Sequence, residues 1–140
     1  MNTKTSRKYR SMFAVILFGA VYLVVGVAFP NPPATDKTQF MWRLAAWLIC
    51  AVAFAIHICL SLFRFGNAPQ RTAFQAAASV ALGAFGLAVA ANIHSLMAGT
   101  RYQPLLALAL AIWPWLTGVP AFVVAFVAAT VLAKFKLRLT

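Results

Sequence analysis

The chain has 140 residues, of which 64% are hydrophobic and only 9% are charged, and its 12 Lys and Arg side chains face a single acid, Asp36. Soluble domains carry about a quarter charged residues, so this composition excludes a soluble globular protein and predicts one integral membrane domain, residues 1–140. The basic residues stand at the ends of apolar runs rather than along one face. We therefore expect contact with anionic lipid head groups at the cytoplasmic surface of the bilayer, and no nucleic acid partner.

Four apolar runs separated by short polar segments predict an all-α bundle of four transmembrane helices. The predicted spans are residues 11–29, 42–64, 73–97 and 105–133, and each is long enough to cross a hydrocarbon core of about 30 Å. The first run follows a basic segment, as a signal peptide would, but it exceeds the apolar region of about 7–15 residues typical of such peptides. We favour an uncleaved span, in which Gly19 and Gly26 allow another helix to approach closely.

The distribution of positive charge predicts the orientation of the spans. With a cytoplasmic N-terminus, the cytoplasmic side holds Lys4, Arg7, Lys8, Arg10, Arg64, Arg71, Lys134, Lys136 and Arg138. The outer side then holds only Lys37, Arg43 and Arg101. Because cytoplasmic loops carry the excess of Lys and Arg, we expect a multi-pass protein of a bacterial-type inner membrane with both termini in the cytoplasm.

The second run carries a narrow polar stripe. At 100° per residue, its polar positions fall within about 60° of one another on a helix. These positions are Arg43, Cys50, His57, Ser61 and Arg64. An unpaired polar group in hydrocarbon costs several kcal/mol, so the stripe is expected to face protein or an aqueous path rather than lipid.

The third run carries a matching face of small and polar residues, Ser79, Gly83, Ala90 and His94. Small residues at this spacing are typical of closely packed transmembrane helices. If the second and third runs form an antiparallel hairpin across the turn at 65–70, Ser79 lies level with His57. Similarly, His94 lies level with Arg43. We therefore predict that the two faces form one helix–helix interface.

His57 is the deepest ionisable residue of the second run. Ionisable groups inside a bilayer are functional candidates, and the structural alternative is a neutral imidazole that hydrogen-bonds Ser79 across the interface; we favour the structural role. One haem between His57 and His94 is disfavoured, because helical rise separates their depths by about 20 Å. A symmetric dimer that brings two copies of His57 level remains open.

The fourth run is interrupted by Trp113, Pro114 and Trp115, and later by Pro120. We predict a single span with a kink between Trp113 and Pro120, rather than a re-entrant hairpin. The Trp113–Trp115 segment is a candidate lipophilic pocket for a quinone, a carotenoid or a lipid tail. The alternative, which we favour, is a proline kink whose freed carbonyls are satisfied by the indole N–H groups.

The spans carry none of the usual chemistry of a membrane enzyme. No carboxylate lies in any span, and the chain has no Cys-x-x-Cys, no phosphate-binding glycine loop and no Ser–His–Asp set. We expect a small non-enzymatic membrane protein without a cofactor or metal, acting as an accessory subunit or self-associating scaffold in a homo-oligomer or larger complex. The alternatives are an oligomeric channel or transport module lined by the polar stripe, and a redox subunit that binds haem, quinone or another lipophilic cofactor.

Overall fold

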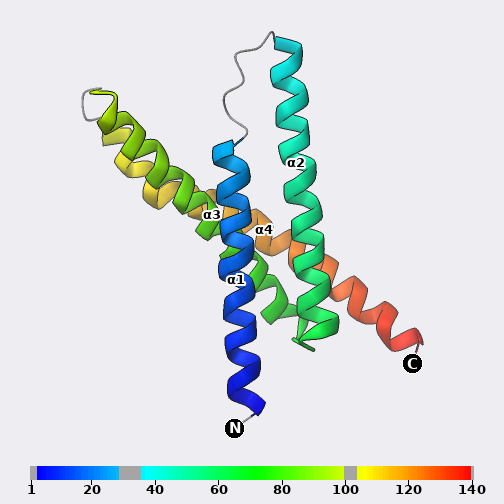
Figure 1. The fold of residues 1–140 in the computed structure, drawn as a ribbon. Coiled ribbons are helices and arrows are strands. Elements are labelled where there is room, and N and C mark those ends of the chain that lie inside the picture. The colour runs from blue at the N-terminus through cyan, green and yellow to red at the C-terminus, as the bar shows by residue number, and fades with distance from the viewer. Residues whose placement is uncertain (1–2, 29–35, 100–103, 140) are drawn as a thin grey trace.

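The computed structural model describes residues 3–28, 36–99 and 104–139, and its regular elements over these residues are all helices (Figure 1). They are α1 (Thr3–Ala28), α2 (Asp36–Cys59), the short π-helix η1 (Leu60–Arg64), α3 (Pro69–Met97) and α4 (Pro104–Leu139). Four stretches are long and apolar enough to span a membrane: Tyr9–Ala28, Gln39–Arg64, Pro69–Met97 and Leu105–Phe135. The chain is a multi-pass membrane protein, as predicted. The predicted end of the first span at residue 29, and the segment that follows it up to residue 35, lie outside the described residues.

The two ends of α3 are defined by local backbone chemistry. Gly66 in the preceding turn has φ 62°, a conformation that glycine adopts without steric cost. Pro69 occupies the first turn of the helix, where its missing N–H is not needed. At the other end Gly99 has φ 65° and its N–H donates to the Leu96 carbonyl at 3.2 Å, which terminates the helix.

The end of the second span is a π-helix, which the sequence periodicity did not predict. The N–H of Phe65 donates to the carbonyl of Leu60 at 3.0 Å, a bond across five residues instead of four. This wider turn changes the angular spacing of the side chains. Ser61 and Leu62 consequently point inward, at 0% and 5% exposure, while Arg64 is exposed. The straight polar stripe predicted to reach Arg64 is therefore wrong at its C-terminal end.

The helices form two antiparallel pairs that cross obliquely (Figure 1). Helices α1 and α2 lie side by side, and the hairpin of α3 and α4 passes behind them. Helix α3 is central, because it packs closely along α4 on one side and against α1 on the other. The second and third spans were predicted to share one interface along their polar and small-residue faces, but the contact between α2 and α3 is small.

The apolar stretches of α3 and α4 are longer than that of α1. The apolar stretch of α1 has 20 residues, whereas those of α3 and α4 have 29 and 31. At helical rise, the α1 stretch is about 30 Å long and matches the hydrocarbon core, while the other two exceed 40 Å. A hairpin steeply inclined to α1 places the longer helices in the same bilayer.

Helix α4 is continuous through Pro114 and Pro120. The fourth run is therefore one helix and not a re-entrant hairpin, as predicted. The bend expected between Trp113 and Pro120 stays a prediction. Asn92, near the C-terminal end of α3, links the two helices of the α3–α4 hairpin. Its Nδ2 donates to the carbonyl of Leu106 on α4 and to that of Ala88 on α3, each at 2.8 Å.

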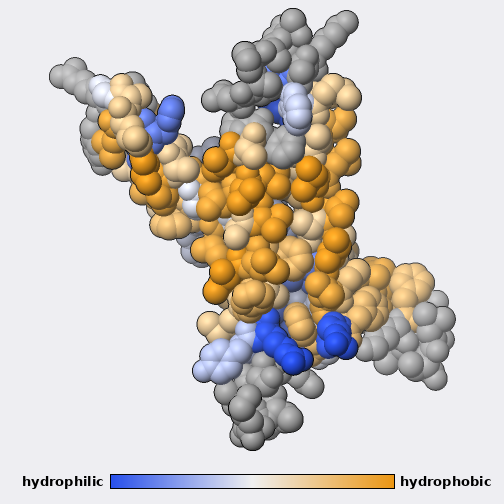
Figure 2. Space-filling model, viewed as in Figure 1, coloured by the Kyte–Doolittle hydropathy of each residue, from blue (hydrophilic) through white to orange (hydrophobic). Residues whose placement is uncertain are grey.

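The surface is mostly apolar, as expected for a protein solvated by lipid. Figure 2 shows a broad hydrophobic belt across the middle of the molecule and strongly hydrophilic residues toward its lower end. The buried apolar positions are largely alanines, among which Ala73, Ala76, Ala125 and Ala129 are fully buried around Ile58. These small side chains allow α3 and α4 to approach closely.

Candidate functional site

A cluster of polar side chains is buried where α1, α2, η1 and α3 meet. Its members, which we call the buried polar cluster, are Ser11, His57, Ser61, Asn67, Thr72, Gln75 and Ser79. The largest fully buried side chains among the described residues are His57, Thr72, Ser61 and Ser79. The interior thus holds a polar cluster beside the alanine core, while the surface is apolar. In a bilayer, hydrogen bonds and close packing between helices take the place of the hydrophobic effect.

Gln75 of α3 is the hub of this cluster. Its Nε2 donates to the Ser11 hydroxyl of α1. Its Oε1 accepts from Asn67 Nδ2 at 3.0 Å and from the Ser61 hydroxyl at 3.4 Å. One side chain therefore connects α1, η1 and the turn that precedes α3. Sequence reasoning missed Gln75, because the residue lies about 80° from the Gly83 face on a regular helix; its presence as an amide within an apolar run was the available signal.

His57 is fully buried between α1 and α3. Its Nδ1 lies 3.3 Å from Ser79 Oγ, which is the contact predicted from the equal depth of the two residues. The Ser79 hydroxyl donates its hydrogen to the Gln75 carbonyl at 2.9 Å, so the bond to His57 requires the imidazole to donate from Nδ1. The ring also stacks on Phe18 of α1, with centroids 4.5 Å apart and planes inclined by 13°.

Three buried polar atoms among the described residues have no hydrogen-bond partner: His57 Nε2, Thr72 Oγ1 and Tyr22 Oη. With Nδ1 as the donor, Nε2 of His57 is a bare acceptor. The His57 side chain is nevertheless enclosed by protein on both sides, by Phe18 and by Ser79. Its position favours a packing role between helices over a role in contact with an aqueous path.

Gly83 lies at a close approach between two helices, and its partner is α1. A Cβ at this position would lie 2.6 Å from Tyr22 Cβ and 3.2 Å from the Gly19 carbonyl oxygen. One turn further along, a Cβ on Gly86 would meet the Leu23 side chain at 3.0 Å. The small-residue face of the third span was correctly placed in a tight interface, and its assignment to α2 was wrong. The close approach predicted for Gly19 is present.

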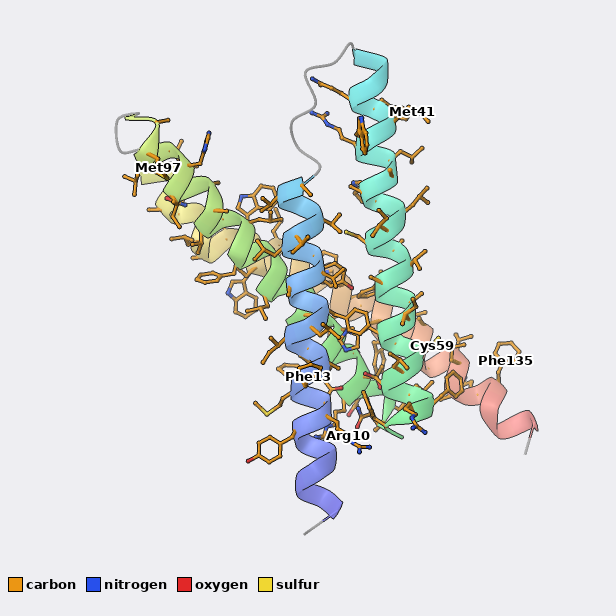
Figure 3. All side chains as sticks on the ribbon, in the orientation of Figure 1. Arg10, Phe13, Met41, Cys59, Met97 and Phe135 are labelled. Carbon is orange, nitrogen blue, oxygen red and sulfur yellow. The ribbon has the colours of Figure 1, made fainter. Side chains whose placement is uncertain are left out.

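The structure does not bring the remaining predicted residues together. On α2, Arg43 is exposed and Cys50 is half-buried, and on α3, Ala90 is half-buried and His94 is exposed. Helices α2 and α3 diverge away from the turn at 65–68. Figure 3 shows Met41 of α2 well separated from Met97 of α3. The prediction that one α2–α3 interface extends from Ser79 to His94 is therefore wrong, and the contact is confined to the region of His57 and Ser79.

The Trp113–Trp115 segment borders an apolar groove of about 360 Å³ between α3 and α4. The groove is lined by Phe74, Ala77, Ala78, Ala81, Pro114, Trp115, Gly118, Val119 and Phe122. Trp113 does not line the groove and is 50% exposed. Its carbonyl accepts a hydrogen bond from the Thr117 hydroxyl at 2.8 Å. Of the three residues predicted to form a lipophilic pocket, Pro114 and Trp115 thus border a groove.

The donor set for a metal ion is sparse. Within residues 3–28, 36–99 and 104–139, no group of three His, Cys, Asp or Glu side chains gathers in a way that holds a metal. The free thiols Cys50 and Cys59 lie on α2 and are half-buried and exposed, respectively. No protein-family model, no curated protein sequence and no solved structure matches this chain.

Proposed function

We propose that this chain is a non-enzymatic membrane protein that works as an assembly component, either a self-associating scaffold or an accessory subunit of a larger complex. The observation that carries the proposal is the use made of the intramembrane polar groups. Gln75 and Ser79 bond to neighbouring helices and to their own backbone, and His57 is enclosed by Phe18 and Ser79. These groups stabilise the packing of the helices against one another. The surface of the protein is then the part available for contacts with other molecules.

The apolar surface supports assembly through α2. This helix contacts the rest of the chain mainly near its cytoplasmic end, and its other half carries large exposed side chains. Trp47 is 78% exposed and Leu48 is 59% exposed. Tryptophan is enriched among the residues that dominate protein–protein interfaces. We place the association surface on this part of α2.

Cross-linking in native membranes tests the assembly. In a background without Cys50 and Cys59, Trp47→Cys is expected to form a disulfide-linked dimer under mild oxidation, and Val124→Cys at an exposed position of α4 serves as the control. If Trp47→Cys does not cross-link, native mass spectrometry of the gently solubilised protein should show a second polypeptide, which identifies an accessory subunit. A protein that stays monomeric and without a partner in both experiments contradicts the proposal.

The channel alternative finds less support in the geometry. A conducting stripe requires its five residues to line one continuous path, whereas they range from exposed to fully buried along α2 and η1. These residues are Arg43, Cys50, His57, Ser61 and Arg64. Ion flux through liposomes that contain the purified protein would support the channel function. An absorbance band of a bound haem or quinone would do the same for the redox alternative.

We further propose that both termini face the cytoplasm of a bacterial-type inner membrane. The charge distribution supports this orientation, and α1 begins on the same side of the molecule as α4 ends (Figure 1). Ala68 in the turn before α3 and Ala98 at the end of α3 are both exposed and belong to opposite ends of that helix. In a cysteine-free background, a membrane-impermeant maleimide added outside intact cells is expected to label Ala98→Cys and not Ala68→Cys. The reverse pattern contradicts the orientation.

A further inference from the structure

The groove between α3 and α4 lies on the face of this hairpin that is turned away from α1. At 100° per residue, Phe74, Ala78 and Ala81 fall about 140–180° from Gly83, the residue that contacts α1. The floor consists of small residues, and at Gly118 a Cβ would lie 3.3 Å from Ala81 Cβ. Phe74 and Trp115 are 69% and 72% exposed and form the rims. The groove is therefore a shallow apolar channel that opens toward the surroundings of the protein.

The position of the groove within two membrane spans restricts its occupant to an apolar chain. All nine lining residues belong to the apolar stretches Pro69–Met97 and Leu105–Phe135. Apart from the indole N–H of Trp115, no lining side chain carries a hydrogen-bonding group, so the groove offers water few partners. Its volume of about 360 Å³ is in the range of small-ligand sites, so a single hydrocarbon chain fits the space better than a compact polar ligand.

A positive charge stands at the cytoplasmic end of the groove. Arg71 is exposed and precedes Phe74 by one turn of α3, and on the helix it falls within about 60° of Phe74 and Ala78. The contact of Gly118 with Ala81 places Trp115 level with residue 84 of α3. The groove thus ends about 20 Å along α3 from Arg71. Because the hairpin is inclined, this length corresponds to roughly the 15 Å depth of one leaflet.

We propose that the groove binds one acyl chain of an anionic phospholipid whose head group pairs with Arg71. The guanidinium provides charge-assisted hydrogen bonds to a phosphate group, and the chain runs from Phe74 over Ala78 and Ala81 to Trp115. The chain as a whole carries a net charge of +11, which attracts anionic lipid to the same membrane surface. The site requires only that the chain spans a membrane, and it does not depend on the assembly proposed above.

Fluorescence quenching by brominated lipid tests the site in the intact chain. Trp42, Trp47 and Trp113 are replaced by phenylalanine so that Trp115 is the single fluorophore, and the protein is placed in nanodiscs of phosphatidylcholine and phosphatidylglycerol. In each sample only one of the two lipids is brominated, near the ends of its acyl chains. The mole fraction of the brominated lipid is the same in both samples. We expect brominated phosphatidylglycerol to quench Trp115 at least twofold more strongly than brominated phosphatidylcholine.

Three variants identify the groups responsible. Arg71→Gln should make the two lipids equally effective, whereas Arg64→Gln, which removes another exposed arginine from the same end of the molecule, should preserve the preference. Ala78→Leu fills the groove and should also remove the preference while Arg71 is retained. Thermal unfolding of each variant shows that the fold is intact.

Equal quenching by both lipids in the parent protein would overturn the proposal, as would a preference that Arg64→Gln removes as completely as Arg71→Gln. If neither brominated lipid quenches Trp115, a second copy or another protein covers the groove. This result also overturns the lipid site. A protein that is monomeric and without a partner in the cross-linking and native mass experiments, but retains the preference, would leave the lipid site standing and contradict the assembly.

Discussion

Replacing Gly83 with leucine is expected to destabilise the helix assembly by about 3 kcal/mol, at the upper end of the range for overpacked interfaces. The reason is the contact between α3 and α1. Even the first carbon of a side chain would lie 2.6 Å from Tyr22 Cβ and 3.2 Å from the Gly19 carbonyl oxygen. Neither atom moves by rotation of a side chain, because one is fixed to the backbone and the other belongs to it. The helices would have to separate.

Two other variants calibrate this effect in the same detergent. Gly86→Ala lies on the same face of α3 but meets the end of the Leu23 side chain, at 3.0 Å, which rotates away at lower cost. His57→Ala removes the hydrogen bond to Ser79 and the stacking on Phe18, and bonds of this kind contribute about 0.6 kcal/mol on average between membrane helices. Thermal unfolding should rank Gly83→Leu as the least stable of the three. A lower unfolding temperature for His57→Ala would contradict this account.

The number of the apolar helices was predictable, because the length of an apolar run depends on the sequence alone. The four predicted runs correspond to α1, to α2 with η1, to α3 and to α4. The contact of His57 with Ser79 was also predictable, because a short turn fixes the relative depth of two residues on consecutive helices. Both features are local in the sequence.

The partner of the Gly83 face was not predictable in the same way. Periodicity identifies which side of a helix is small, and it does not identify which helix covers that side. The sequence neighbour α2 was the expected partner, but the oblique crossing places α1 on Gly83 instead. Because Gly83 has no side chain, Tyr22 Cβ and the Gly19 carbonyl of α1 can approach the α3 backbone closely.

The hub role of Gln75 depends on a second non-local feature. Gln75 binds Ser61 and Asn67 only because η1 and the following turn direct these side chains toward α3. A regular helix through Arg64 would direct them elsewhere. The segment Leu60–Arg64 contains no proline or glycine that would signal a departure from α-helical geometry. Tertiary hydrogen bonds to Gln75 offset the free-energy cost of the π-helical turn. The hydrophobic periodicity of the sequence does not predict such bonds.

Replacing Gln75 with leucine is expected to destabilise the protein by about 2 kcal/mol, the second largest effect, because three hydrogen bonds are lost at once. The bonded partners would remain in protein surroundings without a replacement. Ser11, Ser61 and Asn67 are 2%, 0% and 7% exposed, and leucine offers none of them a donor or an acceptor. Separation of α1 from η1 should accompany the loss, since Gln75 is the side chain that bonds to both.

The matched control is Gln70→Leu, the same exchange one and a half turns earlier on α3, where the side chain is exposed. This variant should unfold within about 0.5 kcal/mol of the parent, as surface substitutions do. The double variant Ser11→Ala with Gln75→Leu should be less destabilised than the sum of its single changes, because removing Ser11 relieves an orphaned hydroxyl. Equal thermal stability of Gln75→Leu and Gln70→Leu, or strict additivity with Ser11→Ala, would show that Gln75 does not link the helices.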